Sequence, residues 1–239
     1  NGVSYLFVIA SLLMMKISPR KAAPRQKKVV HELKEGFKYT FGFAPIRYLI
    51  LLLALVSLVG MPYTVLMPVF AKEILHGGSH TFGFLMGASG MGALLGALFL
   101  ASRKNVLGLD KVIPLAAATF GAGLIAFSFS RFFLLSMGLM VFVGLGMMLQ
   151  MASTNTILQT IVDDDKRGRV MSFYTMAFMG TAPFGSFIAG SLASKIGAPD
   201  TLVVGGVACL LGTLIFVKYL PHFQKAIRPI YIRLGLVPR

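Results

Sequence analysis

The sequence carries little charge for its length. Of its 239 residues, 13% are Asp, Glu, Lys or Arg, whereas a soluble domain carries about 25%. The interiors of six long apolar runs contain none of these residues and no His. Because 56% of the chain is hydrophobic, this shortage excludes an ordinary soluble core and predicts a membrane protein.

Cysteine and acidic residues are also scarce. The one cysteine, Cys209, cannot form a disulfide within the chain and is expected to pack as a small apolar side chain. Eight acidic residues stand against 23 basic ones, which gives a net charge of +15. In a soluble protein this excess would suggest nucleic acid as a partner. Here the basic residues flank apolar runs, so we expect a lipid bilayer and no nucleic acid as the partner.

The sequence lacks the side-chain sets that catalysis needs. It shows no Ser, His and Asp set, no phosphate-binding loop and no paired carboxylates within the apolar runs. His31 and Glu32 begin like a zinc-protease motif, but Glu35 stands where the second His is required. His76 and His80 are separated by two glycines, which favour a turn over a ligand face. We therefore expect no enzyme, no catalytic residue, no metal site and no cofactor.

Six long apolar runs predict six membrane-spanning helices. A hydrocarbon core of about 30 Å requires ~20 helical residues, and each run is near or above that length. Barrel strands of about 10 residues with alternating polarity do not fit this pattern. The predicted fold class is therefore an all-α membrane protein. The runs are Ile46–Phe70, Thr81–Ser102, Val112–Ser130, Phe132–Val162, Val170–Ser194 and Thr201–Tyr219.

Around these runs the chain divides into four parts. Residues 1–16 are expected to be the end of a truncated membrane helix, because the chain opens inside an apolar run. Residues 17–45 form a basic linker, residues 46–220 the six-span bundle and residues 221–239 a basic tail. The second half of the linker predicts an amphipathic helix along the lipid headgroups, and a solvated linker is the alternative. Its apolar face would carry Val30, Leu33, Phe37 and Phe41.

Basic residues are distributed unequally across the predicted membrane. Twenty of the 23 Lys and Arg residues lie in the two ends and in two loops on one side, and three lie on the other. Because cytoplasmic loops carry an excess of Lys and Arg, the basic side is expected to be cytoplasmic. The chain is then a polytopic protein of the cytoplasmic (inner) membrane with its C-terminus in the cytoplasm.

Three of the spans carry uncharged polar residues or helix breakers. An amide in mid-membrane is costly unless it faces a partner or water, and spans interrupted by Gly or Pro point to a transport pathway. We expect a cavity here, with hydrogen bonding between helices as the alternative, and we expect Leu52 to face lipid. The candidate pathway residues are Tyr63, Thr64, Gln150, Thr154, Asn155, Tyr174 and Phe178.

A charged hairpin, Asp163–Arg169, separates the fourth and fifth runs. Its three aspartates, Asp163–Asp165, favour capping of the following helix, since acidic side chains suit a helix N-terminus. Binding of a divalent ion is the alternative. Arg167 and Arg169 are expected to anchor a gate at the cytoplasmic side by pairing with groups on neighbouring loops.

The hairpin and the run after it resemble major facilitator transporters, in the branch of enterobactin exporters and transmembrane secretion effectors. The matching segments are Arg167–Ser172, Tyr174–Gly180, Ala182–Ser186, Glu35–Tyr39 and Arg228–Tyr231. The resemblance implies that the chain is the C-terminal half of a twelve-helix transporter. It also implies a missing N-terminal six-helix half and a proton gradient as the driving force. The loop with Arg103 and Asp110 would join the gate, although it lacks the family's Asp before the Arg.

The function expected from these features is secondary transport. The resemblance favours efflux by antiport, and the many Met and Phe residues suit a small amphipathic substrate such as a drug, a siderophore or a metabolite. A lysophospholipid transporter is the first alternative. A membrane scaffold or sensor that does not transport is the second.

The basic asymmetry generates a topology prediction. Reporter fusions are expected to give an outside signal at His76, Ser130 and Ala198. They are expected to give a cytoplasmic signal at Gln26, Asn105, Asp164 and Lys225. Alkaline phosphatase and fluorescent-protein fusions would measure this, and a cytoplasmic signal at Ala198 would overturn the last two spans.

Overall fold

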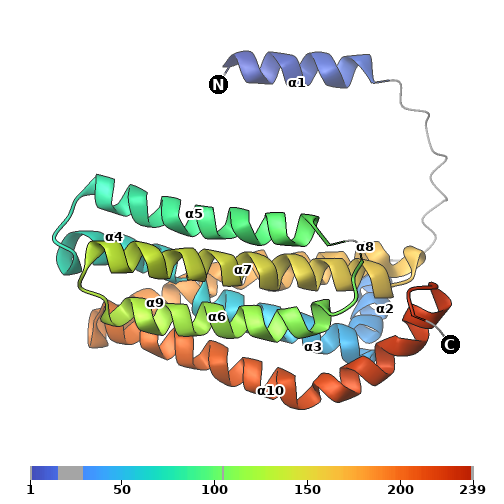
Figure 1. The fold of residues 1–239 in the computed structure, drawn as a ribbon. Coiled ribbons are helices and arrows are strands. Elements are labelled where there is room, and N and C mark those ends of the chain that lie inside the picture. The colour runs from blue at the N-terminus through green and yellow to red at the C-terminus, as the bar shows by residue number, and fades with distance from the viewer. Residues whose placement is uncertain (1, 16–28, 104, 238–239) are drawn as a thin grey trace. The chain divides into compact units, whose positions relative to one another are not determined.

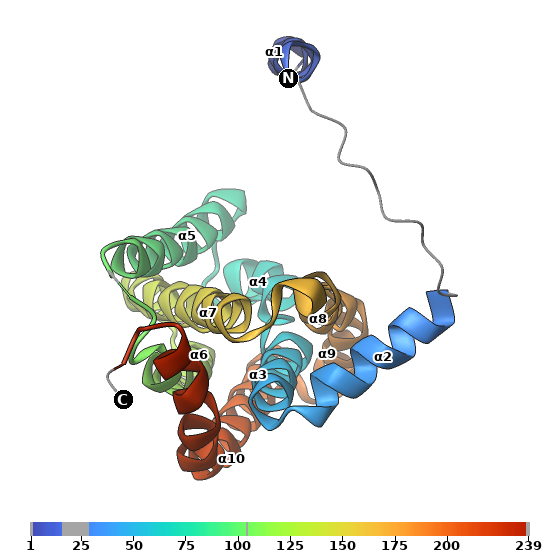
Figure 2. The ribbon, with the colours of Figure 1, turned by 90° about the vertical axis from the view of Figure 1, so that its right-hand side faces the viewer.

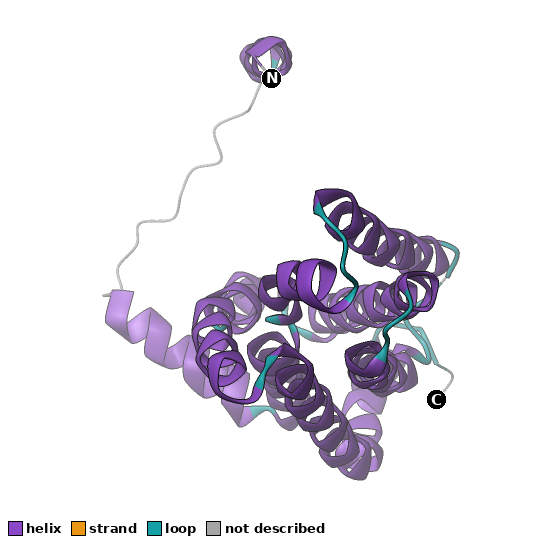
Figure 3. Ribbon diagram, turned by 90° about the vertical axis from the view of Figure 1, so that its left-hand side faces the viewer, coloured by secondary structure: helices purple, strands orange, loops and turns teal. Residues whose placement is uncertain are grey.

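A computed structural model describes residues 2–15, 29–103 and 105–237, and every regular element in these ranges is a helix (Figure 3). The chain divides into two units, Asn1–Lys34 and Glu35–Arg239. The first unit contains helix α1 (Gly2–Met14), whose apolar side chains are exposed along its length. The second unit holds the helical bundle that is described below.

Six helical segments of the described chain are long and apolar enough to cross a membrane, as the sequence predicted. The first, Ala44–Ile74, is built from α3 (Ala44–Leu55), η1 (Val56–Gly60), α4 (Tyr63–Val69) and η2 (Phe70–Ile74). The fifth, Asp164–Ile196, is built from α8 (Asp164–Thr175), η3 (Met176–Gly180) and α9 (Ala182–Ile196). The others are α5 (Ser79–Ala101), α6 (Leu109–Phe129), α7 (Phe133–Ile161) and α10 (Ala198–Arg233). The predicted all-α membrane fold is therefore confirmed.

The bundle is layered around α7. Helix α7 lies between α5 and α6, and α6 in turn lies against α10 (Figures 1 and 2). Helix α10 has 36 residues, or ~54 Å at 1.5 Å each, which exceeds a hydrocarbon core of about 30 Å. The tail expected from residue 221 thus begins inside a continuous helix that ends at Arg233.

Helix α2 (Val29–Gly42) precedes the first span and packs on the start of the fifth. Phe37 and Phe41 stack on each other and both meet Phe173 of α8 edge-on, at 6.1 Å between ring centroids. Lys38 is exposed. A helix is therefore present where the sequence predicted one, and its residues Phe37 and Phe41 contact α8; its place along the lipid headgroups stays a prediction. The side chains of Val30 and Leu33 lie outside the described residues.

Glycines allow α5 and α7 to touch through their backbones. A Cβ added at Gly144 would lie 1.8 Å from the carbonyl oxygen of Ser89, and one added at Gly92 would lie 1.9 Å from that of Val141. No side chain fits at either distance. Close approach of this kind is the main source of packing energy between helices in lipid, where no hydrophobic drive exists.

We expect Gly144→Ala to destabilise the bundle because the added methyl group must push α5 and α7 apart. Overpacking of this kind costs about 1–3 kcal/mol, which thermal unfolding in detergent would measure. Gly138→Ala on the same helix is the control, since a Cβ there meets nothing within 4 Å. Equal unfolding temperatures for the two variants would contradict the close contact.

Candidate functional site

The breaks predicted in the first and fifth spans are π-helical turns. Segment η1 ends at Gly60, just before Pro62, and η3 ends at Gly180, just before Pro183. In η1 the backbone N–H of Met61 donates to the carbonyl of Val56 at 3.2 Å, five residues back. Such turns widen a helix by one residue and occur frequently at functional sites.

The two π-helical turns are bonded to each other. The hydroxyl of Ser57 in η1 donates to the carbonyl of Phe178 in η3 at 2.5 Å. Two glycines of other helices press on the same turn: a Cβ at Gly185 would lie 2.1 Å from the carbonyl oxygen of Leu58, and one at Gly205 would lie 2.4 Å from that of Val59. The first span is thus held at close range by α9 and α10 at the point where it is irregular.

Four of the candidate pathway residues are buried within the bundle. The hydroxyl of Tyr63 lies 3.1 Å from that of Ser89, and the hydroxyl of Tyr174 donates to the carbonyl of Met151 at 3.1 Å. Gln150 and Thr154 are 1% and 0% exposed. In the described residues, Gln150 Nε2 and Thr154 Oγ1 have no hydrogen-bond partner.

Helix α6 covers the face of α7 that carries Gln150. One turn before Gln150, a Cβ at Gly146 would lie 2.6 Å from the carbonyl oxygen of Ala116 on α6. The structure therefore brings Tyr174 against the backbone of α7, but it directs the amide of Gln150 toward the bundle interior. Whether Gln150 and Thr154 contribute to a pathway stays a prediction.

The remaining candidates are less buried. Thr64 is exposed and donates to the carbonyl of Met61 at 3.1 Å. Asn155 is half-buried and accepts a hydrogen bond from the amide of Gln159 one turn later. Phe178 is half-buried, and its carbonyl is the acceptor for Ser57. Leu52, expected to face lipid, is 4% exposed, whereas its neighbour Leu51 is 50% exposed. That expectation was wrong because Leu52 lies on the side of α3 that faces α10.

A groove of about 550 Å³ runs along α8 and η3. Its lining repeats every three to four residues, so that one stripe of the helix forms it, and it contains no charged side chain. The hydroxyls of Ser172 and Thr175 donate to carbonyls four residues back, at 2.9 and 3.0 Å. Sequence reasoning missed this stripe, although the spacing was visible. The lining residues are Gly168, Met171, Ser172, Thr175, Met176, Met179 and Gly180.

Charged side chains gather at the opposite end of the bundle from the π-helical turn η2. Asp163 precedes α8 and forms ion pairs with Arg233 of α10 at 3.5 Å and with Lys166 at 3.6 Å. It also accepts a hydrogen bond from the hydroxyl of Tyr39 of α2 at 3.5 Å. Burial and the negative charge of Asp163 raise the pKa of the Tyr39 phenol, so it remains a donor at neutral pH. Asp163 makes no capping hydrogen bond, whereas Asp164 and Asp165 do lie in the first turn of α8.

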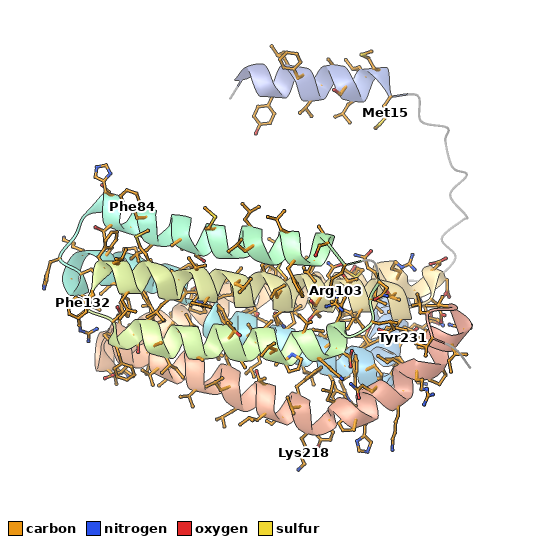
Figure 4. The ribbon with its side chains drawn as sticks, in the orientation of Figure 1. Met15, Phe84, Arg103, Phe132, Lys218 and Tyr231 are labelled. Carbon is orange, nitrogen blue, oxygen red and sulfur yellow. The ribbon has the colours of Figure 1, made fainter. Side chains whose placement is uncertain are left out.

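The four predicted gate residues do not converge on one point. Arg169 reaches across to Glu35 of α2 at 3.4 Å, whereas Arg167 pairs with Asp164 on its own helix at 2.6 Å. Asp110 accepts from the amide of Gln224 of α10 at 2.5 Å. Arg103 donates to the carbonyl of Leu107 in its own loop at 2.6 Å, and Figure 4 shows it beyond the end of α5.

Comparison with known proteins gives one family and two relatives. The profile of the transmembrane secretion effector family matches residues 1–230. The staphyloferrin A transporter of Staphylococcus aureus is 27% identical over 164 residues, which are 68% of this chain and 40% of the relative. An uncharacterized MFS-type transporter of Bacillus subtilis, YfmI, is 22% identical over 218 residues, 90% of this chain and 51% of the relative. The chain thus spans about half the length, or less, of these relatives.

We expect Asp163→Asn to loosen α2 and the end of α10, because Asp163 joins both to α8. The loss of stability should stay below about 1 kcal/mol, since these pairs are partly exposed. Hydrogen exchange would show the effect as faster exchange near Tyr39 and Arg233. Asp165→Asn, in the same turn of α8, is the control. Equal exchange in both variants would contradict the role of Asp163 in joining α2 and α10 to α8.

Proposed function

The chain belongs to the transmembrane secretion effector family of the major facilitator superfamily, and from this membership we propose that it forms one six-helix half of an exporter. The exporter would move a small amphipathic compound by alternating access. The observation that supports this most is the bonded pair of π-helical turns, η1 and η3, in two spans that are polar or interrupted in mid-membrane. Irregular backbone at membrane depth is tolerated where protein buries it or where it lines a cavity.

The uncharged groove on α8 and η3 is our candidate for the pathway surface of this half. Met171, Met176 and Met179 supply thioethers, which are polarizable and flexible enough to fit ligands of varied shape. The hydroxyls of Ser172 and Thr175 are already bonded to the helix backbone. The groove therefore suits an apolar or amphipathic part of a substrate.

One relative is named as a transporter of staphyloferrin A, and we propose a siderophore among the substrate classes, beside a drug or another metabolite. The candidate pathway residues and the groove lining contain no cation. The charge that an acidic substrate or a proton-driven cycle requires would then come from residues outside this surface. A proton gradient as the driving force is part of the same proposal.

We further propose that the charged end of the bundle faces the cytoplasm and acts as a gate. Arg169 of α8 and Glu35 of α2 form an ion pair, and the rings of Phe37, Phe41 and Phe173 form a cluster between the same two helices. Gly36 packs on the same two residues of α8, since a Cβ there would lie 3.4 Å from Arg169 and from Phe173, an ordinary contact distance. A change in the tilt of α8 would be transmitted to α2 through this pair.

Deletion of the gene tests the function itself. We expect at least one small compound to accumulate in the cells and its concentration in the medium to fall, as measured by untargeted mass spectrometry of both. Expression of the intact gene from a plasmid should restore export. Unchanged compositions in iron-limited and iron-replete medium would contradict the exporter and favour a scaffold.

Two arginines of the hairpin test the gate. Arg169→Ala should lower the restored export at least about fivefold, which is the scale of a modest coupling free energy. Arg167→Ala should leave export near the intact level, because Arg167 pairs within its own helix. Immunoblots of membranes would confirm equal amounts of both variants. Equal export by both variants would contradict the gate and leave the hairpin with a role in membrane topology only.

A further inference from the structure

A second groove, of about 470 Å³, lies between α3 and α10. Its walls are Leu51, Leu55 and Ile215, of which Leu51 and Ile215 are 50% and 61% exposed. Gly212 lies on the α10 side, where a Cβ would lie 2.0 Å from Leu55. The two helices therefore touch at Gly212 and diverge toward the charged end of the bundle, where the groove opens.

Aromatic and basic side chains surround the mouth of the groove at that end. The rings of Tyr48 and Tyr219 stack across it with 5.1 Å between centroids. The guanidinium of Arg47 lies 5.4 Å from the centroid of the Tyr48 ring and donates to the carbonyl of Phe41 at 3.2 Å. Tyrosine and arginine in this arrangement are typical of the boundary between hydrocarbon and lipid headgroups.

The length of the groove limits what can fill it. Along α3 it extends from Arg47 to Leu55, or ~12 Å at 1.5 Å per residue. A hydrocarbon core of about 30 Å is more than twice as long. A membrane-spanning helix would need contact over the full thickness, whereas an acyl chain of a single leaflet fits a groove of half that depth.

The charge on both walls favours an anion at the mouth. The sequence has no Asp or Glu from Gly36 to Lys72 and none after Asp200. On these two segments only cations flank the mouth, namely Arg47, which lines it, and Lys218, which precedes Tyr219 and projects outward from α10 (Figure 4). Basic pockets between membrane helices bind the phosphates of anionic lipids in this way.

We propose that the groove between α3 and α10 is a binding site for one anionic phospholipid. An acyl chain lies along Leu51, Leu55 and Ile215, and the phosphate contacts the guanidinium of Arg47 beside the tyrosine pair. The lipid would fasten the start of the first span to α10 at the level where the charged end begins. This site is distinct from the groove on α8 and η3, and it does not depend on the transport proposal.

Native mass spectrometry of the purified intact protein tests the proposal. The protein is equilibrated with equal amounts of phosphatidylglycerol and phosphatidylcholine vesicles and is then stripped with detergent. The unmodified protein should retain one phosphatidylglycerol. Arg47→Gln should retain it about tenfold less, because a charge-assisted hydrogen bond is lost.

Matched variants separate the groove from general effects of charge and hydrophobicity. Lys195→Gln removes an exposed cation at the end of α9, which does not line the groove, and should change retention less than twofold. Ile215→Trp should fill the groove and abolish retention, whereas Leu134→Trp, at a position on α7 that is 81% exposed, should not. Each substitution lies at an exposed or half-buried position, and thermal unfolding would confirm that each variant folds.

Three results would overturn the site. Retention of phosphatidylglycerol by Arg47→Gln at the unmodified level would remove the phosphate contact. Equal retention of phosphatidylcholine would show that only the acyl chain is bound. Thermal stabilisation by inorganic phosphate to the same extent as by phosphatidylglycerol would show a free-anion site in place of a lipid site.

Discussion

The structure depends on one constraint: backbone polar groups inside hydrocarbon must be bonded within the protein. The first span satisfies this constraint less easily, because η1 interrupts its regular α-helical hydrogen bonds. Ser57 bonds this turn to η3, and Gly185 and Gly205 bring α9 and α10 against its carbonyls. Three of the other five spans therefore contact this irregular turn, because Phe120 of α6 also lies beside it, 2.3 Å from where a Cβ at Gly60 would be.

The sequence predicts those features of the fold that depend only on keeping charged side chains out of hydrocarbon. Charged side chains cannot enter hydrocarbon cheaply, so the apolar runs predict the number and order of the six spans, although α10 continues to Arg233, well past the end of its run at Tyr219. Gly60 with Pro62, and Gly180 with Pro183, likewise mark two of the three places in the described chain where the helix changes to a π-helical turn. These features are local, and the neighbours of a helix do not alter them.

The direction in which a side chain points is not local. Leu51 and Leu52 are chemically equal, yet one is half exposed and the other buried. Gln150 and Asn155 are similar amides in one apolar run, but Gln150 is buried inside the bundle and Asn155 is only half-buried. Arg167 and Arg169 differ in the same way, since only the docked helix α2 gives Arg169 a partner across the bundle. The groove on α8 and η3 could not be predicted, because in an apolar run its residues Met171, Met176 and Met179 look like ordinary packing residues.

The central proposal is alternating access, in which the groove on α8 and η3 is open to each side of the membrane in turn. Thiol labelling in oriented vesicles tests this most directly, with Thr175→Cys in the groove and Gln150→Cys in the buried face, and with the native Cys209 buried. We predict that an impermeant maleimide modifies position 175 from the charged end of the bundle and that an imposed proton gradient changes the labelling rate. If Gln150 belongs to the pathway as the sequence predicts, position 150 should react as well, whereas protection there would leave Gln150 as a buried packing residue. Protection of position 175 under every gradient, or a labelling rate at both positions that no gradient alters, would contradict the account.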